Sequence, residues 1–298
     1  MFDIKITIGI TAYKCNKYLN KAIDSVIAQS SNQWEGVLIL DGGADKKTTE
    51  IFNLFEHPKF RKYVFKENQG PYGTRAKAID LSKTDWYYQL DGDDLLSPNA
   101  VRNIIEAIKN NPNAEFVYGN WEHFSTNKIQ IKTPIDDPEA LCLGPLFVAV
   151  FPIKKSLFES LGGFYNGFFI NADWDFWLSV YENDIIGAYT NNVLYKQRKL
   201  RSNNVGATHS HLTPFIVEKI IHRHPSYFCN DERKNIAKFN VYQKLARHYK
   251  LIGDRENATK YAKEALKYGD SIPAFDTIFQ EEKMSFLRYK LRRLGRFV

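Results

Sequence analysis

An Asp-Gly-Asp-Asp sequence at residues 91–94 follows a short apolar and aromatic run at residues 86–90. Such a run is typical of a buried strand, and α/β folds build their sites at the carboxyl ends of strands. Carboxylates are hard oxygen ligands, and Mg²⁺ or Mn²⁺ is commonly held by one or two of them together with substrate phosphates. The alternative is an acidic loop that caps the next helix, with Ser97 as the N-cap and Pro98 at the first position. A cap alone does not require three acids.

Polar and aromatic side chains also follow two earlier strand-like segments. The ring of Tyr13 could stack on a base while Thr11 hydrogen-bonds the edge of that base. Packing of Tyr13 into the core is the alternative. Asp41 ends the second segment, and an acceptor-only carboxylate suits the N–H or O–H groups of a nucleoside. An Asx-type turn into the glycines that follow Asp41 is the other interpretation.

A further acidic sequence begins at Asp173 and is rich in aromatic residues. Desolvation by the neighbouring Trp174, Phe176 and Trp177 could make Asp173 a better general base near neutral pH. The same aromatic residues could instead form a helix face that is buried in the core. Asp175 lies two residues further on and therefore on a different face of a helix, which makes it the natural control for Asp173.

The segments that would position these residues alternate between strand and helix patterns. Predicted strands cover residues 4–11, 37–40, 63–65, 86–90 and 116–118, and predicted helices cover 18–29, 47–55, 73–81 and 98–110. Residues 144–199 are looser, with strand-like pieces at 146–151 and 193–197 around a helix at 174–182. After about residue 210 only helices are predicted, at 216–221, 234–251, 255–268 and 275–293. We therefore expect an α/β domain over residues 1–209 and a smaller all-helical domain over residues 210–298.

The second domain contains a segment that resembles one tetratricopeptide unit, residues 242–268. A single unit cannot bury the core of a solenoid, so we expect a helical hairpin that packs on its neighbours.

The composition excludes several classes of protein. The chain has 298 residues, of which 44% are hydrophobic and 25% charged, as in ordinary globular proteins, so disorder is not expected. Cys15, Cys142 and Cys229 are far apart and form no CxxC pair, which indicates reduced thiols and not a zinc site or a disulfide framework. No apolar run approaches the length of a membrane span, and the first residues enter a strand pattern directly. These features favour a cytoplasmic protein.

The positive charge is concentrated near the C-terminus. From Lys283 onward there are six cations and no acid, so this tail carries six of the seven net positive charges. Nucleic-acid binding would require a basic face with a reading module, and neither is found, so no nucleic-acid partner is expected. One helical stripe of the tail is apolar, which suits a helix lying on the anionic inner face of a membrane; it comprises Leu287, Leu291, Leu294 and Val298. A solvated helix end or a contact between copies in a homo-oligomer are the alternatives.

The motifs follow one another in an order that resembles a known enzyme family. Along the chain they are Thr11-Ala12-Tyr13, Asp41-Gly42-Gly43-Ala44-Asp45, Asn68-Gln69-Gly70 before Arg75, Asp91-Gly92-Asp93-Asp94, Gly162-Gly163-Phe164 and Asp173-Trp174-Asp175-Phe176-Trp177. This order, over about residues 4 to 205, resembles the family-two inverting glycosyltransferases, which have the GT-A fold with a Rossmann-like mixed sheet. The resemblance implies a nucleotide-sugar donor, Mn²⁺ or Mg²⁺ on the central acidic motif, and transfer with inversion to a hydroxyl of a glycan or lipid-linked acceptor, as in polysaccharide biosynthesis.

The resemblance also implies roles for individual residues. Nucleotide-binding roles fall on Thr11, Ala12, Tyr13, Asp41, Gly70, Arg75, Asp91, Gly92 and Asp93. UDP is the nucleotide it favours, with Asp41 on the imide of uracil or on the ribose. It implies metal-binding roles for Asp93 and Asp94, with Asp94 as the direct ligand and Asp93 nearer the ribose. Asp173 matches the general base of the family.

Several positions depart from the pattern or leave alternatives open. Lys14 and Ala76 replace asparagines that are common in the family, and Leu40 replaces a carboxylate, which affects donor details more than the reaction class. Arg75 could contact the nucleotide or an acid of the site, or lie on a helix surface. Cations at Arg198 and Arg201, with Ser202, lie where this fold often places a mobile loop over the diphosphate.

Other functions remain as competing hypotheses. A phosphohydrolase with Asp91 as nucleophile would have Thr or Val where Asp94 stands. A nucleotidyltransferase would have a glycine-rich triphosphate loop, which is not found. His209 and His211 could add metal ligands, although histidines of a polar loop are more often solvated. A non-catalytic nucleotide- or carbohydrate-binding scaffold is the last alternative, and the presence of all three acids together with Asp173 argues against it.

Overall fold

The structure is a computed structural model that describes residues 4–125, 128–134, 137–144, 151–199 and 209–269. These residues belong to two compact units. The first unit comprises Met1–Pro134 and Phe147–Ser202, and the second comprises Ile135–Leu146 and Asn203–Val298. Residues 135–146 thus belong to the same unit as the C-terminal helices. The prediction, which placed the domain boundary between residues 209 and 210, assigned this inserted segment to the first domain.

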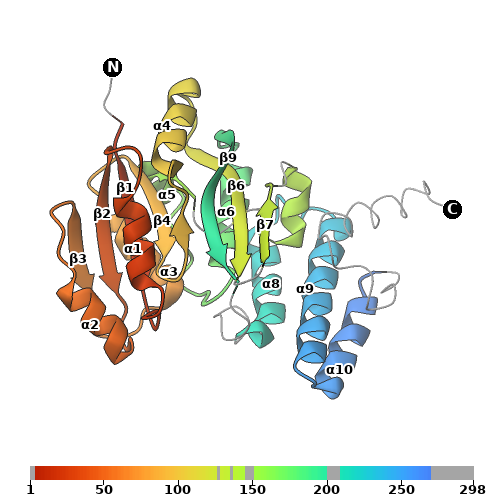
Figure 1. Cartoon of the computed structure of the whole chain (residues 1–298). Coiled ribbons are helices and arrows are strands. Elements are labelled where there is room, and N and C mark those ends of the chain that lie inside the picture. Colours follow the sequence, from red (N-terminus) through yellow and green to blue (C-terminus); the bar gives the residue numbers. More distant parts are fainter. Residues whose placement is uncertain (1–3, 126–127, 135–136, 145–150, 200–208, 270–298) are drawn as a thin grey trace. The chain divides into compact units, whose positions relative to one another are not determined.

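The first unit is built on a mixed sheet with strand order β3-β2-β1-β4-β8-β6-β9-β5, and β7 pairs with β6 (Figure 1). Its strands are β1 (Ile6–Ala12), β2 (Trp34–Leu40), β3 (Phe60–Val64), β4 (Trp86–Asp91), β5 (Leu95–Leu96), β6 (Phe116–Ser125), β7 (Lys128–Lys132), β8 (Ile153–Lys154) and β9 (Gly187–Arg198). Strands β3, β2, β1 and β4 are parallel, as expected where helices connect them. The short strand β8 is antiparallel to β4 and to β6, and β6 and β9 are again parallel.

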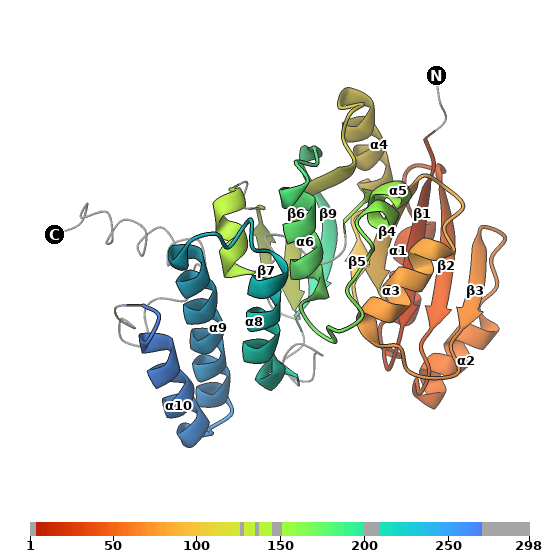
Figure 2. The ribbon, with the colours of Figure 1, turned by 180° about the vertical axis from the view of Figure 1, so that it is seen from behind.

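Helices cover both faces of this sheet (Figures 1 and 2). On one face lie α1 (Leu19–Ile27), α2 (Lys46–Leu54) and α4 (Ala100–Asn110); on the other lie α3 (Gly70–Asp80), α5 (Lys155–Ser160) and α6 (Ala172–Glu182). Alternate side chains of a strand point to opposite faces, so a strand between two helical layers is apolar on both. The predicted α/β class is therefore confirmed.

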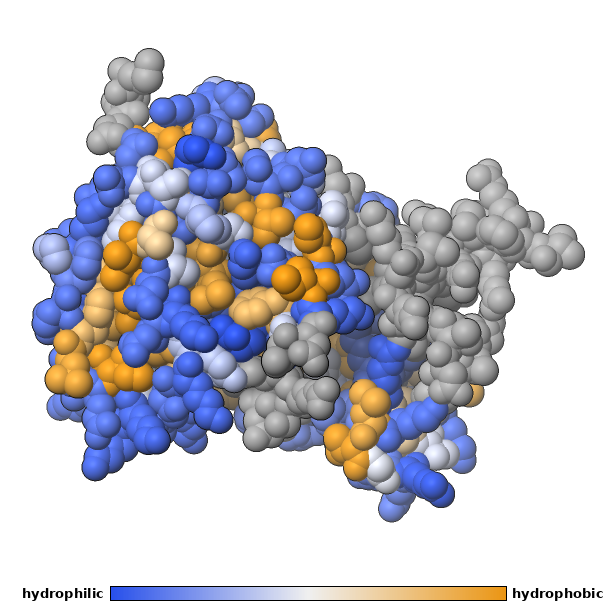
Figure 3. Space-filling model, in the orientation of Figure 1, coloured by the Kyte–Doolittle hydropathy of each residue, from blue (hydrophilic) through white to orange (hydrophobic). Residues whose placement is uncertain are grey.

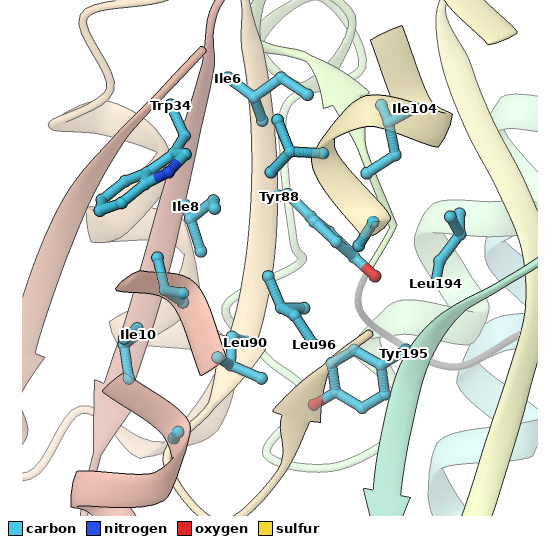
Figure 4. Packing of buried hydrophobic residues seen from close by; sticks show 14 of the residues in the cluster. Ile6, Ile8, Ile10, Trp34, Tyr88, Leu90, Leu96, Ile104, Leu194 and Tyr195 are labelled. Atoms are coloured by element: carbon cyan, nitrogen blue, oxygen red, sulfur yellow. The ribbon is translucent and has the colours of Figure 1, made fainter. Parts of the chain in front are cut away.

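The core of the first unit lies between the sheet and the layer of α1 and α4 (Figure 4). Ile6, Ile8 and Ile10 of β1 are fully buried there. They pack with Tyr88 and Leu90 of β4 and with further labelled side chains of α4, β5 and β9: Ile104, Leu96, Leu194 and Tyr195. Burial of each large apolar side chain contributes about 1.5–3 kcal/mol. This layer keeps the carboxyl ends of β1 and β4 in a constant position.

The second unit is helical. It contains the 3-10 turns η1 (Pro138–Leu143) and η2 (Ser210–Leu212) and the helices α8 (Thr213–Arg223), α9 (Asp231–Leu251) and α10 (Arg255–Leu266). The predicted hairpin is formed by α9 and α10, with the rings of Tyr249 and Tyr261 stacked 5.4 Å apart. Arg233 of α9 pairs with Glu139 of η1, which attaches the inserted segment to the helices.

Some predicted elements differ from those observed. The helix expected at residues 73–81 begins at Gly70, because Pro71 fits the first turn of a helix. Strand β7 and helix α5 were not predicted, since each is short: the alternation of apolar residues in β7 extends over only five positions, and α5 has six residues. The predicted strand at 146–151 and helix at 275–293 fall almost wholly or wholly outside the described residues, as does the basic tail from Lys283.

No helix in the described part of the chain combines the length and the apolar composition that a membrane crossing requires. On the face shown in Figure 3, hydrophilic residues surround and interrupt the apolar areas.

Candidate active site at the carboxyl edge of the sheet

Three parallel strands end side by side at one edge of the first unit. Thr11 of β1 lies in register with Asp91 at the end of β4, and Ala12 lies in register with Leu40 at the end of β2. The residues that follow these strands therefore meet, as the sequence predicted. Hydrogen bonds close the edge, because the hydroxyl of Thr11 donates to Oδ1 of Asp91 over 3.4 Å and the amide of Gly92 donates to the carbonyl of Thr11 over 2.9 Å.

The motif needs a glycine at position 92. A Cβ atom there would lie 2.8 Å from the sulfur of Cys15 and 2.8 Å from the carbonyl oxygen of Thr11, closer than real contacts allow. Burial first, and then the nearby charge of Asp93, raises the pKa of Cys15 to about 12. This thiol is therefore an inert packing group, as the sequence indicated.

Asp91 forms an ion pair with Arg75 of α3. Nη2 of Arg75 lies 2.7 Å from Oδ2 of Asp91, and its Nε lies 3.3 Å from Oδ1, which is a two-point contact with a carboxylate. Arg75 is only 8% exposed. Of the alternatives considered for Arg75, the structure supports contact with an acid of the site and excludes a helix-surface position.

Asp94 is buried, and other residues of the protein occupy both of its carboxylate oxygens. The hydroxyl of Tyr195 donates to Oδ2 over 2.8 Å, and the amide of Arg198 donates to Oδ1 over 2.6 Å. Burial, followed by the charges of Asp93 and Asp91, raises the pKa of Asp94 well above its usual range. These contacts tie the acidic motif to the end of β9.

Asp93 is partly exposed, as is Asp91. In the described part of the chain, no hydrogen-bond donor from another residue reaches its carboxylate. Burial first, and then the charge of Asp91, raises the pKa of Asp93 to about 6. The neighbouring cations Arg198 and Arg75 oppose this rise in the pKa of Asp93.

Asp41, which follows β2, organises the turn that leads into α3. Its oxygens accept from the amides of Gly42 and Gln69, over 2.9 and 2.8 Å, and from the side-chain amide of Asn68 over 2.9 Å. Burial, opposed by the amide of Gln69, raises the pKa of Asp41. Asp41 thus holds the turn that starts α3. The four lone-pair positions of its carboxylate leave room for at most one further donor.

Tyr13 and Gly70 flank this turn. The ring of Tyr13 is 38% exposed, which excludes the core-packing alternative, and Nζ of Lys14 lies 4.9 Å from its centre. Ala12 is fully buried, and its carbonyl accepts a hydrogen bond from the amide of Asp41 over 3.0 Å. Gly70 has φ +70°, and a Cβ atom there would lie 2.7 Å from the ring of Phe169, so the close approach of the loop that precedes α6 requires a glycine.

Asp173 lies in the first turn of α6 and is 7% exposed. The hydroxyl of Tyr72 donates to its Oδ1 over 2.5 Å. The N-cap Asn171 has φ 62° and makes no side-chain cap, so the first turn leaves backbone N–H groups that favour a carboxylate. The control residue Asp175 is buried as well, at 2% exposed.

Tyr72 and Tyr195 are the residues that sequence reasoning missed. Each holds a carboxylate that lies 101 positions away in the chain: Tyr72 holds Asp173, and Tyr195 holds Asp94. The sequence around neither tyrosine carries a local signal of such a contact. Of the predicted diphosphate loop, Arg198 is described and its Nε donates to the carbonyl of Asp93 over 2.8 Å, while Arg201 and Ser202 lie outside the described residues.

The side chains present fit a divalent cation that is completed by a substrate. No group of three His, Cys, Asp or Glu side chains converges on one point within the described ranges, His209 and His211 included. Mg²⁺ and Mn²⁺ bound with a nucleotide diphosphate need only one or two carboxylates. Asp93 has its carboxylate open for this purpose, whereas each oxygen of Asp94 already accepts one hydrogen bond.

The family model for glycosyl transferase family 2 matches residues 7–169, which is more than half of the chain. The chain belongs to this family. A glycosyltransferase of Haemophilus influenzae is 24% identical over 196 residues, which cover 63% of this chain and 65% of that protein. A glycosyltransferase of Rickettsia felis is 25% identical over 188 residues, 59% of this chain and 31% of that protein. The chain therefore spans less than two thirds of the length of these relatives.

Solved structures share the fold of this glycosyltransferase. TarS of S. aureus, residues 1–349 in complex with UDP-GlcNAc, gives a TM-score of 0.59 at 12% identity and covers 92% of this chain and 95% of that one. The mannosyltransferase PcManGT from Pyrobaculum calidifontis, in complex with GDP-Man and Mn²⁺, gives 0.59 at 16% identity and covers 99% and 84%. The GT-A fold inferred from the sequence motifs is confirmed.

Proposed function

We propose that this glycosyltransferase moves a sugar from a UDP-sugar to a hydroxyl of a glycan or lipid-linked acceptor, with inversion at the anomeric carbon. The observation that carries the proposal is a continuous set of contacts at one sheet edge, from Thr11 through Asp91, Arg75 and Tyr72 to Asp173. A group suited to bind a diphosphate and a group suited to accept a proton are thereby part of one connected site.

The donor side is assigned from charge and exposure. Tyr13, being exposed, suits stacking on a base, and Thr11 and Asp41 lie beside it at the ends of β1 and β2. Asp93 would hold Mn²⁺ or Mg²⁺ with the diphosphate, and Asp94 would act by fixing the motif to Tyr195 and Arg198. A divalent cation, when bound, neutralises charge that develops on the leaving nucleoside diphosphate.

The acceptor side is assigned to Asp173. In the proposed step the acceptor oxygen attacks the anomeric carbon from the side opposite the diphosphate. A new C–O bond forms, and the bond between the anomeric carbon and the phosphate oxygen breaks with its electron pair leaving on UDP. The acceptor proton passes to Oδ2 of Asp173, which no donor in the described part of the chain occupies. Proton transfer to a positioned base of this kind contributes about 10²- to 10⁴-fold in rate.

Location and membrane contact are proposals from sequence. The amphipathic basic tail from Lys283 would place the enzyme on the anionic inner face of a membrane, where lipid-linked acceptors are found.

A donor screen followed by product analysis tests the function. UDP with Mn²⁺ should raise the melting temperature more than GDP with Mn²⁺, and much more than UDP with EDTA. The anomeric configuration of the sugar released from an α-linked UDP-sugar, followed by proton NMR, should be β at first appearance. Retention of the α configuration would contradict inversion. Nucleotide binding with no turnover of any donor would favour the scaffold alternative.

A further inference from the structure

A single hydroxyl joins helices α3 and α6. Tyr72 in the first turn of α3 donates to Oδ1 of Asp173 over 2.5 Å, which is the length of a strong, charge-assisted O–H···O⁻ bond. Burial first, and then the charge of Asp173, raises the pKa of Tyr72 well above its usual value. The hydroxyl therefore keeps its proton and acts as a donor throughout the working pH range.

The ring of Tyr72 is held on two sides. The ring of Phe164 lies 5.1 Å away in an edge-on arrangement, and the guanidinium of Arg75 lies 5.2 Å from the ring centre. Phe164 is itself fixed by Phe158 and Phe176, at 5.0 and 5.7 Å. The Gly162-Gly163-Phe164 motif thus supports Tyr72, and the hydroxyl has little freedom to leave Asp173.

Tyr72 and Arg75 are three positions apart on α3 and therefore lie on the same side of the helix. Arg75 holds Asp91 of the acidic motif, and Tyr72 holds Asp173. One helical turn consequently sets the spacing between the donor-binding acid and the candidate base. The hydrogen bond from Tyr72 takes one oxygen of Asp173 and leaves the other without a donor among the described residues.

An aspartate carboxylate that is not held rotates easily, because its terminal torsion is broad. With Oδ1 fixed by Tyr72, the second oxygen points in a defined direction. We propose that Tyr72 is a positioning residue for the transfer reaction, which orients Oδ2 of Asp173 toward the acceptor hydroxyl. This inference rests on the proposed function, in which Asp173 is the base.

The test compares Tyr72→Phe with Asp173→Asn and with the double variant. Tyr72→Phe removes one oxygen and leaves the ring between Phe164 and Arg75. With UDP-GlcNAc and Mn²⁺, or whichever UDP-sugar of the same panel is turned over fastest, kcat should fall about 10- to 100-fold while KM for the donor stays within twofold. In the Asp173→Asn background, Tyr72→Phe should cause no further loss, because the base it orients is absent.

Tyr189→Phe is the matched control. Its hydroxyl, like that of Tyr72, bonds to side-chain oxygens, here those of Asn120 and Asn191 at 3.2 Å each. Tyr189 lies on β9, and these hydrogen bonds do not involve Arg75, Asp91 or Asp173. Its kcat should equal that of the wild type. Melting temperatures of the single and double variants provide a readout that needs no donor: the effects of Tyr72→Phe and Asp173→Asn should be clearly non-additive.

Different outcomes separate the two proposals. A kcat for Tyr72→Phe within twofold of the wild type, or losses that multiply in the double variant, would overturn the positioning role while Asp173→Asn remains impaired. Additive shifts in melting temperature would also overturn it. Full activity of Asp173→Asn would instead show that the base itself is misassigned, and the positioning role would fall with it.

Discussion

The two carboxylate regions of the site are held in opposite ways. At the end of β4, Asp91 and Asp94 have partners on both oxygens, and these partners come from α3 and β9. At the start of α6, one hydroxyl holds Asp173 and leaves its second oxygen open among the described residues. In the proposed function, Asp91 and Asp94 shape the site. Asp93 and Asp173, each with an oxygen that accepts no hydrogen bond from another described residue, take part in the chemistry.

Asp173→Asn should have the largest effect on this contrast. Asparagine keeps the size and most of the packing but cannot accept the acceptor proton, so turnover should fall by about 10²- to 10⁴-fold. Nucleotide affinity should barely change, because in the proposed function Asp173 faces the acceptor and not the nucleotide. Steady-state kinetics beside calorimetric titration with UDP would measure both quantities.

Asp175→Asn is the control for this variant, since Asp175 is buried one half-turn away. This substitution should lower the melting temperature and leave kcat of the folded enzyme near that of the wild type. If Asp175→Asn abolished transfer while Asp173→Asn stayed active, the two roles would have to be exchanged.

Asp93→Asn should separate binding from stability. With Mn²⁺ present, affinity for UDP should fall by about 10- to 100-fold, a loss of the size seen when supporting groups of a metal site are removed. Asp94→Asn, whose oxygens already have partners in the protein, should lower stability in addition. An Asp93→Asn enzyme with unchanged metal-dependent binding would return the ligand role to Asp94.

The metal-free form of Asp93→Asn should be more stable than the wild type at pH 7.5. The pKa of Asp93 is about 6 in the folded protein and about 3.9 in an unfolded chain, so the folded state binds the proton more tightly. The stability that this proton contributes is complete below about pH 4 and is lost as the pH rises through about 6. Removing the charge should restore about 1–2 kcal/mol at pH 7.5, measurable by urea unfolding in EDTA. An equal dependence on pH in the variant would contradict the assignment.

Arg75→Met should destabilise the first unit by about 2–4 kcal/mol, because it leaves Asp91 partly buried without its partner. Arg75→Lys should recover part of this loss but not the two-point contact. Unfolding midpoints of the two variants give the comparison. A surface-like cost below about 0.5 kcal/mol would show that the pair is not structural.

In the helical unit, a buried tyrosine hydroxyl makes hydrogen bonds comparable to that of Tyr72, but no catalytic role is predicted for it. The hydroxyl of Tyr227 accepts from the amide of Cys142 and donates to the carbonyl of Glu139. Tyr227→Phe should cost about 1 kcal/mol and leave kcat unchanged. A large loss of kcat without loss of stability would assign the helical unit a part in the reaction.

Deletion of the basic tail should have the smallest effect of these changes. Deletion of residues 283–298 should weaken binding to anionic vesicles at low salt, since each cation near such a surface contributes about 1 kcal/mol. Sedimentation with vesicles of 30% phosphatidylserine would measure it. Unchanged binding after the deletion would exclude the tail as an anchor.

Sequence patterns were sufficient where a contact follows from strand order. Thr11, Asp41 and Asp91 meet because three parallel strands end together, and short apolar runs predict those strands. The contacts that distinguish Asp94 from Asp93 were not visible in the sequence, because they come from Tyr195 and Arg198 at the end of β9. The contact of Tyr72 with Asp173 depends likewise on the approach of α3 and α6 in three dimensions, which no local pattern encodes.

Calorimetric titration of UDP in Mn²⁺ and in EDTA, for the wild type, Asp93→Asn and Asp173→Asn, tests the central claim most directly. The account predicts tight binding that requires Mn²⁺ in the wild type, the same binding in Asp173→Asn, and a loss of about 10- to 100-fold in Asp93→Asn. Binding of UDP that is equal in EDTA and in Mn²⁺, or equal in the wild type and Asp93→Asn, would contradict it.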